Sequence, residues 1–196
     1  MKRGFDVITS LIGLVLLIPL LLIIALLIKL LMPGPVFFRQ ERVGRCGKSF
    51  RIFKFRTMCC DAEAKGRQIT VGEDPRITRS GRFLRRYKLD ELPQLLNVVL
   101  GEMSLVGPRP EVPRYVSLYP DDVRDQVLSV PPGITDYASI EYKDENAILG
   151  RAPDPDRAYI EEVMPVKLKY YLRYVAERSL WLDFILIIRT VKAIMK

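Results

Sequence analysis

Apolar residues fill the first part of the chain. The run from Val7 to Met32 is almost wholly apolar, and its few interruptions are Thr9, Ser10, Gly13, Pro19 and Lys29. A membrane helix needs about 20 residues of this kind, so the run is long enough to meet lipid. A cleavable signal peptide is not expected, because the apolar core of such peptides has roughly 7 to 15 residues and no small-residue cleavage site follows.

Pro19 divides this apolar run. Proline removes a backbone donor and clashes with the preceding turn, so it should kink or break the helix. Each half then has about 12 residues and reaches roughly 18 Å, short of the roughly 30 Å hydrocarbon core. Basic residues flank both ends of the run, at Lys2, Arg3, Arg39, Arg42, Arg45 and Lys48. A re-entrant hairpin places both basic ends on the cytoplasmic side, as the positive-inside preference favours. A single kinked span is the alternative.

Beyond residues 32–35, Met-Pro-Gly-Pro, the pattern is that of a soluble domain. Residues 36–43 and 49–58 predict two strands around a glycine-containing turn. Helical spacing over 81–100, divided by Pro93, predicts two helices, of which the second begins near Asp90 or Glu91 and ends at Gly101. The other expected elements are a polar loop with a short helix over 61–78, a short helix over 121–129, an irregular segment over 130–156, and helices over 159–177 and 180–195.

These elements predict an α/β fold: a compact, mostly helical domain with a small β-hairpin, mounted on an N-terminal re-entrant membrane segment of helix, break and helix. The membrane hairpin is expected to comprise residues 1–32, broken at Pro19, and the globular domain residues 33–196. The final helix is amphipathic, with Trp181 and Phe184 on its apolar side. Such a helix is suited to the headgroup layer, although packing on the domain core is equally compatible with the pattern.

The charge of the chain indicates an anionic partner. A formal charge of +8 and a pI near 9.5 suit nucleic acid, an anionic membrane surface or a phosphorylated substrate. The basic, aromatic hairpin is compatible with RNA, but in a chain fixed in lipid such charge is better suited to headgroups or a phosphorylated substrate. The chain has no histidine, so proton transfer and metal binding must use other groups. Its cysteines, Cys46, Cys59 and Cys60, are too few for a four-ligand zinc site and suit a reducing compartment.

The adjacent carboxylates Asp90 and Glu91 are the strongest candidate for chemistry. Taken alone, two acids at a helix N-terminus are typical of a cap, because the helix dipole and free amides stabilise negative charge. Here basic residues crowd the pair, at Arg85, Arg86, Lys88 and Arg109. Cations collect phosphate and adjacent carboxylates hold Mg²⁺. The combination outlines a phosphoryl-transfer site in which an aspartate can act as the nucleophile.

Three blocks appear in order: KFRTM at 54–58, LDELPQLLNV at 89–98 and GEMSLVGPRP at 101–110. Together they resemble the bacterial sugar transferase family, the monotopic phosphoglycosyl transferases in their small, catalytic-domain-only form. The resemblance implies transfer of a sugar phosphate from a UDP-sugar to undecaprenyl phosphate, with release of UMP. It also implies that the protein is monotopic, lies at the cytoplasmic face of the bacterial inner membrane and starts glycoconjugate assembly there.

The resemblance also implies roles for individual residues. Asp90 matches the nucleophile that attacks the β-phosphate and forms a covalent phosphosugar intermediate, which polyprenyl phosphate then displaces. Glu91 matches the glutamate that serves Mg²⁺, with Asp90 as the second expected metal ligand. Substrate-binding roles are expected for Lys54, Arg56, Arg85, Gln94, Asn97 and Arg109. The expected partners are therefore a UDP-sugar, undecaprenyl phosphate and a phospholipid membrane, without nucleic acid, and a homodimer is left open.

Two departures from the family pattern bear on these expectations. The family's re-entrant helix is often broken at Ser-Pro, where this chain has Ile18-Pro19; the proline is kept, and the resemblance favours the hairpin over the span. Many members have an arginine before Pro-Gly-Ile-Thr-Gly, but Pro131 and Asp136 stand here in place of the arginine and the final glycine. The donor sugar is therefore left unassigned. Alternatives are a membrane-anchored, non-enzymatic binder of anionic lipid or nucleic acid, and an inactive relative or one with an unusual donor.

Overall fold

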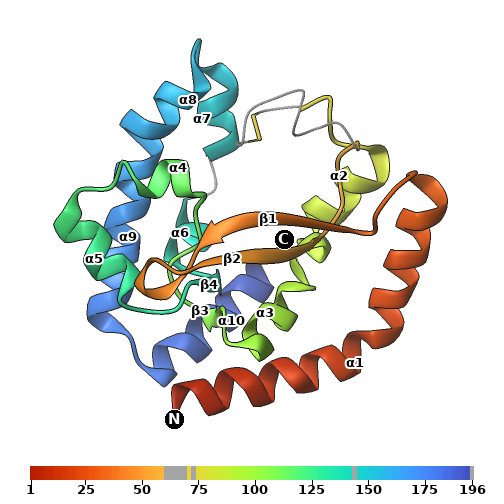
Figure 1. Ribbon diagram of the computed structural model, residues 1–196, viewed down its shortest axis with the longest axis horizontal. Coiled ribbons are helices and arrows are strands. Elements are labelled where there is room, and N and C mark those ends of the chain that lie inside the picture. Colours follow the sequence, from red (N-terminus) through yellow and green to blue (C-terminus); the bar gives the residue numbers. More distant parts are fainter. Residues whose placement is uncertain (60–69, 72–73, 143–144, 195–196) are drawn as a thin grey trace.

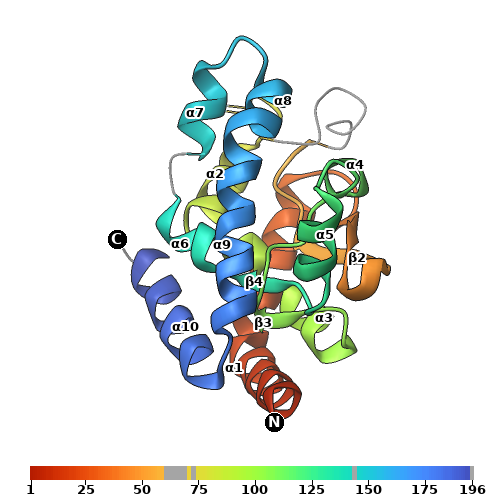
Figure 2. The ribbon, with the colours of Figure 1, turned by 90° about the vertical axis from the view of Figure 1, so that its left-hand side faces the viewer.

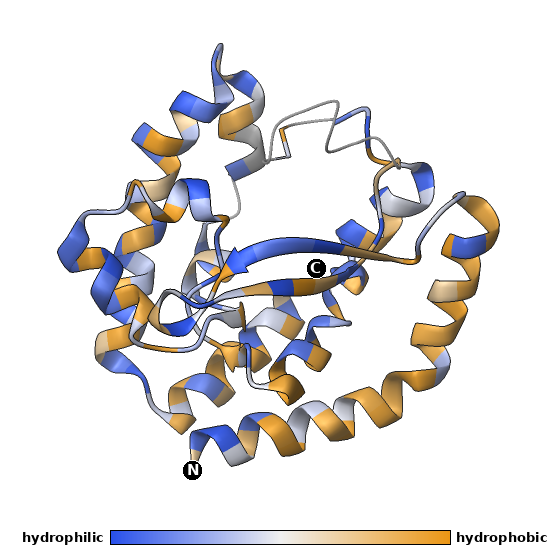
Figure 3. Cartoon of the chain, in the orientation of Figure 1, coloured by the Kyte–Doolittle hydropathy of each residue, from blue (hydrophilic) through white to orange (hydrophobic). Residues whose placement is uncertain are grey.

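The computed structural model of the chain describes residues 1–59, 70–71, 74–142 and 145–194. Most of the loop and short helix expected over 61–78 lies outside these residues. The longest element is helix α1 (Lys2–Leu31), which contains Pro19 and is long and apolar enough to cross a membrane, with only 11% of its most apolar window buried. Figure 1 shows α1 bending as it passes along the base and one side of the body, and Figure 3 shows that the residues along it are predominantly apolar. The break expected at Pro19 is not a gap in the helix, because α1 is continuous through this residue.

The N-terminal end of α1 is fastened to the body by polar side chains. Lys2 pairs with Asp183 near the start of the last helix. Arg3 donates to the carbonyl of Val98 at 2.6 Å. Asp6, which is only 3% exposed, accepts a hydrogen bond of 2.8 Å from the Ser104 hydroxyl. The buried carboxylates Asp6 and Asp183 would be costly without these partners, so the contacts fix this end of α1 on the globular domain.

The C-terminal end of α1 packs on the body through apolar side chains. Ile24, Ile28 and Met32 are buried and form a cluster with Phe55 and Leu84. The carbonyls at the end of the helix are also satisfied, because the guanidinium of Arg56 donates to those of Met32 and Pro33 at 2.7 and 2.8 Å. Both ends of α1 therefore contact one globular body.

The predicted hairpin is confirmed as strands β1 (Phe37–Val43) and β2 (Ser49–Phe55), which pair antiparallel with Phe37 opposite Phe55. The turn η1 (Arg45–Gly47) uses positive φ at Cys46 and Gly47. Phe50 and Ile52 of β2 are buried against Val98 and Met103. The hairpin is therefore held on the helix that follows the carboxylate pair, and it lies across the middle of the molecule in Figure 1.

Three short elements follow: α2 (Arg79–Arg86), the 3₁₀ turn η2 (Leu89–Glu91) and α3 (Gln94–Leu100). Thr78 caps α2 by accepting from the Gly81 amide at 3.0 Å. A side chain at Gly81 would meet the Thr57 carbonyl oxygen at 2.0 Å, so this close approach requires glycine. The helix α3 ends at Gly101 with φ 91°, as predicted, but it begins later than predicted because Asp90 and Glu91 lie in η2.

The C-terminal half is mostly helical around a short parallel pair, β3 (Ser104–Val106) with β4 (Gly133–Thr135). The short helices of this half are α4 (Pro113–Val116), α5 (Asp121–Leu128), α6 (Tyr137–Glu141), α7 (Glu145–Arg151) and α8 (Pro155–Ala158). The irregular segment predicted over 130–156 is therefore wrong in part, because β4, α6 and α7 lie within it. The short helix predicted over 121–129 is confirmed by α5.

Two long helices complete the chain. The π-helical turn η3 (Tyr159–Val163) leads into α9 (Met164–Glu177), and α10 (Leu180–Ile194) follows. Figure 2 shows α9 standing through the middle of this half, with α10 and the start of α1 at its lower end. The largest core cluster joins α9 to α4, α5 and η3. On α10, Leu186 is buried, whereas Trp181 and Phe184 of the predicted apolar side are 71% and 47% exposed, so that side does not pack on the domain core.

Candidate active site

The carboxylate pair lies where three segments converge. The turn η2 carries Asp90 and Glu91, strand β2 carries Lys54, and the loop after β3 carries Arg109. Lys88, just before η2, has φ 55° and turns the chain between α2 and the pair. Asp90 and Glu91 are only 6% and 8% exposed. The fold therefore brings the dyad and two of its predicted cations together from distant parts of the sequence.

Glu91 is held between two cations. Its Oε1 accepts from Lys54 Nζ at 2.7 Å and from Arg109 Nη2, and its Oε2 accepts from Arg109 Nη1 at 3.3 Å. Burial alone would raise the pKa of Glu91, but the charges of Arg109 and Lys54 outweigh burial and hold the pKa well below its usual value. Burial lowers the pKa of Lys54 to about 8, although Glu91 opposes that shift. Glu91 is therefore ionised at neutral pH.

Asp90 has a different environment from its neighbour. Its Oδ1 is buried and has no hydrogen-bond partner among the residues that the structure describes. Burial raises the pKa of Asp90, and the charge of Glu91 adds to that shift while Lys54 and Arg85 oppose it. The two adjacent carboxyls thus have pKa values displaced in opposite directions, a pattern typical of acids with separate chemical roles.

The two remaining predicted arginines serve different parts of the fold. Arg85 of α2 points inward, where its Nε donates to Thr57 Oγ1 at 2.8 Å and its Nη1 to Thr70 Oγ1 at 3.0 Å. Its charge reaches Asp90 and opposes the rise in that carboxyl's pKa. The described hydrogen bonds of Arg56 instead go to the end of α1. Arg85 is therefore placed at the site, whereas Arg56 joins the hairpin to the apolar helix.

The two predicted amides of α3 differ in the same way. Asn97 is fully buried, accepts from the Phe53 amide at 2.8 Å and donates to the Arg51 carbonyl at 3.0 Å. These bonds fasten α3 to β2. Gln94 is 1% exposed, and its Nε2 has no partner among the described residues. Gln94 is the first residue of α3, four positions after Asp90.

The dyad suits a Mg²⁺ ion that is shared with a substrate. Mg²⁺ is commonly held by one or two carboxylates together with phosphate oxygens and water. Among the described residues, Asp90 Oδ1 is buried without a partner and Glu91 Oε2 accepts one long bond, from Arg109 at 3.3 Å. No group of three or more His, Cys, Asp or Glu side chains gathers in the described part of the chain. The residues present therefore fit a metal bound together with a diphosphate better than one bound by protein alone.

A second buried ionic cluster lies close behind Arg109, and the sequence analysis missed it. Glu111 Oε1 accepts from Tyr159 OH at 2.6 Å and from Lys167 Nζ at 3.0 Å, and its Oε2 is 3.7 Å from Arg42 Nη1. Arg42 also donates to the Pro110 carbonyl at 3.1 Å. The sequence did hold one signal, because Lys167 lies among the apolar positions of the helix predicted over 159–177. A lysine is rarely buried unless a carboxylate pairs with it.

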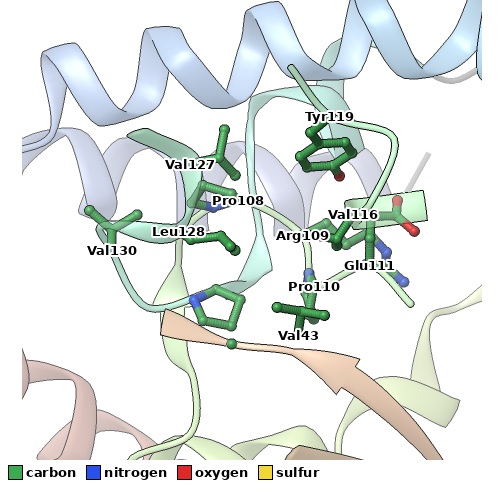
Figure 4. A pocket seen from close by; sticks show the side chains of 12 residues that line it. Val43, Pro108, Arg109, Pro110, Glu111, Val116, Tyr119, Val127, Leu128 and Val130 are labelled. Atoms are coloured by element: carbon green, nitrogen blue, oxygen red, sulfur yellow. The ribbon is translucent and has the colours of Figure 1, made fainter. Parts of the chain in front are cut away.

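The cluster borders a hollow, which Figure 4 shows between the end of β1, the loop 108–111 and helix α5. Its lining is mostly apolar, with Val43, Val127 and Val130 among the contributors. Arg109 and Glu111 supply its charged groups. Arg109 thus connects the dyad on one side with the Glu111 cluster on the other.

Curated relatives match the chain over nearly its whole length. It is 39% identical over 196 residues to the UDP-N-acetylgalactosamine-undecaprenyl-phosphate N-acetylgalactosaminephosphotransferase of Aeromonas hydrophila. It is 38% identical over 194 residues to a UDP-glucose:undecaprenyl-phosphate glucose-1-phosphate transferase of Escherichia coli (strain K12), and 37% identical over 196 residues to the protein of that name from Caulobacter vibrioides. These alignments cover 99%, 97% and 99% of the chain.

The chain spans 43%, 39% and 69% of those three proteins, so the first two are more than twice its length. The model of the family described as bacterial sugar transferase matches residues 1–196. This match includes α1, the hairpin, the dyad and both C-terminal helices. The chain therefore belongs to the bacterial sugar transferase family.

Proposed function

We propose that the protein transfers a sugar phosphate from a UDP-sugar to undecaprenyl phosphate and releases UMP. The observation that carries this proposal is the asymmetry of the dyad: Glu91 is held by Lys54 and Arg109, while Asp90 keeps a buried oxygen that has no partner among the described residues. An oxygen left without a hydrogen bond in a cationic site is suited to attack phosphorus. The names of the relatives, which specify this class of transfer, agree with it.

The reaction proceeds in two displacements at one phosphorus. A carboxylate oxygen of Asp90 forms a bond to the β-phosphorus of the UDP-sugar, and the bond from that phosphorus to the bridging oxygen breaks. UMP leaves with the bonding electron pair, and the sugar phosphate remains on Asp90. A phosphate oxygen of undecaprenyl phosphate then attacks the same phosphorus, forms the diphosphate and releases the Asp90 carboxylate.

The surrounding cations have distinct tasks in these steps. Arg109 and Lys54 fix Glu91 and add positive charge where the phosphates bind. Arg85 is held by two threonine hydroxyls and faces the Asp90 side of the site. Fixed charges of this kind stabilise a transition state without having to reorganise. When Mg²⁺ is bound by Asp90 and Glu91, it supplies neutralisation of charge on the diphosphate.

Helix α1 supports placement of the protein in one face of a membrane. A straight helix of 30 residues would extend roughly 45 Å, more than the hydrocarbon core. Instead α1 bends, and both its ends contact the same body through Lys2 and Arg3 at one end and Met32 at the other. The proposed topology is therefore a re-entrant helix, with the N-terminus and the catalytic domain together at the cytoplasmic face of the bacterial inner membrane.

The topology is tested by single cysteines placed at exposed Met1 and exposed Ser117 in a chain whose native cysteines are replaced. We expect both to react with a membrane-impermeant maleimide only after the inner membrane of spheroplasts is opened. Reaction of the N-terminal cysteine in intact spheroplasts would establish a span and reject the hairpin. The chemistry proposed for Asp90 does not depend on this outcome.

The donor sugar is the open part of the proposal. The relatives named for N-acetylgalactosamine and for glucose are 39% and 38% identical to the chain, so overall similarity does not choose between these sugars. A panel of UDP-sugars tested for UMP release with undecaprenyl phosphate and Mg²⁺ identifies the donor. A protein that only binds lipid or nucleic acid would release UMP from none of them.

The nucleophile is tested with Asp90→Asn and a matched control, Asp125→Asn, at an exposed position of α5. UDP-sugar carrying ³²P in the β-phosphate is mixed with protein in the absence of undecaprenyl phosphate. We expect the wild-type chain and the control to retain label after denaturation and the Asp90→Asn variant to retain none. Retention of label by the Asp90→Asn variant would remove Asp90 as the nucleophile.

A further inference from the structure

The outer face of α2 is an unusual surface, strongly basic and at the same time aromatic. Between Pro75 and Leu89 the chain has five arginines, one lysine and no acidic residue. Two of these arginines are engaged inward or locally, since Arg85 faces the active site and Arg76 pairs with Asp74. The remaining cations are exposed, at Arg79, Arg82, Arg86 and Lys88.

These exposed cations lack ion-pair partners within the described residues. The ion pairs found there include none with Arg79, Arg82, Arg86 or Lys88. Elsewhere on the surface arginines do pair, as Arg124 does with Asp121 and Arg157 with Glu161. Four unneutralised cations on and beside one short helix create a local field that attracts anions.

Two aromatic rings lie among the cations. Phe83 and Tyr87 are 58% and 40% exposed, and their ring centroids are 5.0 Å apart. The Arg86 guanidinium lies 5.7 Å from the Tyr87 centroid. Two neighbouring exposed rings set among cations are typical of residues at the level of lipid headgroups.

The contacts between α2 and the end of α1 indicate what binds to this surface. Leu84, on the opposite side of α2, packs in the cluster of Ile24, Ile28 and Met32 from the lipid-facing helix. Thr78 and Ser80 contact the Met32 sulfur at 3.5 and 3.7 Å. Figure 1 shows α2 beside the end of α1. The basic, aromatic face therefore lies where the chain leaves the membrane, given the placement of α1 proposed above.

We propose that this face, formed by Arg79, Arg82, Phe83, Arg86, Tyr87 and Lys88, binds the headgroups of anionic bilayer phospholipids. The phosphates pair with the four cations, and the two rings lie among the upper acyl carbons. Because Arg85 of the same helix reaches the active site, binding of headgroups to the outer face also sets the position of one wall of that site. Nucleic acid is less suited to the face, because α1 occupies the adjoining surface with exposed apolar side chains such as Leu27 and Leu30.

The test uses a tryptophan at the face as a reporter of lipid contact. The single tryptophan of the chain, Trp181, is changed to Phe, and exposed Phe83 is changed to Trp. The full chain is reconstituted into phosphatidylcholine vesicles containing phosphatidylglycerol. Either lipid is then supplied brominated near the headgroup end of one acyl chain, at equal mole fraction. Quenching of the tryptophan reports which lipid lies against α2.

We expect brominated phosphatidylglycerol to quench the introduced tryptophan more strongly, with an apparent lipid preference of several-fold that declines with salt. Arg82→Gln with Arg86→Gln should remove most of this preference. The matched control, Arg151→Gln with Arg157→Gln on α7 and α8, should leave the preference unchanged. Circular dichroism and the thermal unfolding midpoint verify that each variant is folded.

The proposal would be overturned by an absence of quenching or by equal quenching by the two lipids. A preference that survives the combined Arg82→Gln and Arg86→Gln change would also overturn it. So would displacement of phosphatidylglycerol by RNA or by one equivalent of undecaprenyl phosphate. Displacement by undecaprenyl phosphate would assign the face to the acceptor lipid instead of the bilayer. No sugar donor takes part in this measurement, and the Asp90→Asn chain should show the same preference. Failure of the lipid site is therefore distinguishable from failure of the proposed catalysis.

Discussion

Two glutamates that are buried to the same extent, each with a lysine and an arginine nearby, lie in clusters that differ in one respect. Glu91 and Glu111 are each 8% exposed, and each is paired with a lysine and lies near an arginine. Around Glu111 both carboxylate oxygens have partners supplied by Tyr159, Lys167 and Arg42. Around Glu91 the cations are in place, but the adjacent Asp90 keeps an oxygen that is unpartnered among the described residues.

The difference indicates which cluster does chemistry. A buried ionic group with a full set of partners contributes to the fold and is damaged when one partner is removed. A buried carboxylate without a partner costs stability, and such a cost persists where a reaction uses the group. The dyad is therefore expected to control turnover, and the Glu111 cluster is expected to control stability. This division is tested by making the same kind of substitution, carboxylate to amide, in each cluster.

The largest expected effect is that of Asp90→Asn on turnover. Loss of a nucleophile should lower the rate of UMP release by at least about 10³-fold. Glu111→Gln, the corresponding change in the other cluster, should alter the rate less than about tenfold at a temperature where the protein is folded. Rates are compared under saturating donor and acceptor. Similar losses in both variants would show that the two clusters are not separate.

The second effect is on stability, and here the larger loss is expected in the Glu111 cluster. Glu111→Gln removes the carboxylate 3.0 Å from buried Lys167 and leaves Lys167 with the longer ion pair to Glu145 at 3.5 Å, which should cost about 3 kcal/mol. This loss is measured as a lower free energy of unfolding in detergent. Lys167→Met combined with Glu111→Gln should recover part of it, because the buried ammonium is then removed while Arg42 keeps its charge. Glu161→Gln, which removes an exposed ion pair with Arg157, is the control and should have no measurable effect.

A smaller effect is expected from changing the shape of a cation at constant charge. Arg109→Lys cannot bond both oxygens of Glu91 as the guanidinium does. The value of kcat/KM for the donor should fall by about 10- to 100-fold. Arg114→Lys, at a side chain that is 55% exposed, is the matched control and should change little. Undiminished activity in the Arg109→Lys variant would show that Glu91 needs only a positive charge.

The smallest effects concern pH. Burial raises the pKa of Glu111, but Lys167 and Arg42 outweigh burial and leave the pKa below 4.5. Its stabilisation is therefore complete above the unfolded pKa and is lost as pH falls through the lower folded pKa. Burial raises the pKa of Asp90 above 3.8, so ionised Asp90 costs stability at neutral pH, and this cost disappears as pH falls through the raised folded pKa toward 3.8.

Asp90→Asn should accordingly raise the thermal unfolding midpoint at pH 7, and Glu111→Gln should lower it. Both differences should shrink when the melts are repeated toward pH 4. A lower midpoint for the Asp90→Asn variant at pH 7 would mean that the folded state stabilises the ionised Asp90, and the distinction between the two clusters would fail.

The sequence predicted those parts of the fold that depend on local pattern. The hairpin, α5 and the long C-terminal helices follow from periodicity within about 20 residues, and Gly101 ends α3 as predicted. The parallel pairing of Ser104 with Gly133 was missed because three-residue strands have too little periodicity and their partners are far apart in sequence. The same distance hides the contact between Glu111 and Lys167, since neither residue is exceptional locally.

Which residues gather around the dyad was predicted only in part, for a related reason. The blocks around Asp90, Lys54 and Arg109 indicated residues that the fold brings together. Within the same blocks Arg56 and Asn97 bind backbone groups of α1 and β2 in the described structure. Residue type and motif membership do not distinguish these uses, because a guanidinium serves a carbonyl as readily as a phosphate. The expected substrate contacts of Arg56 and Asn97 stay predictions.

The fastening of Lys2 to Asp183 has a consequence for how the protein is made. Helix α1 leaves the ribosome before its partners Val98, Ser104 and Asp183, which lie far later in the sequence. During that interval a long apolar helix has no body to hold it. With α1 placed in the bilayer as proposed above, early insertion would protect it, and the later pairing of Asp183 with Lys2 would fix the finished domain beside the lipid. The order of the sequence therefore predicts that the chain is synthesised at the membrane.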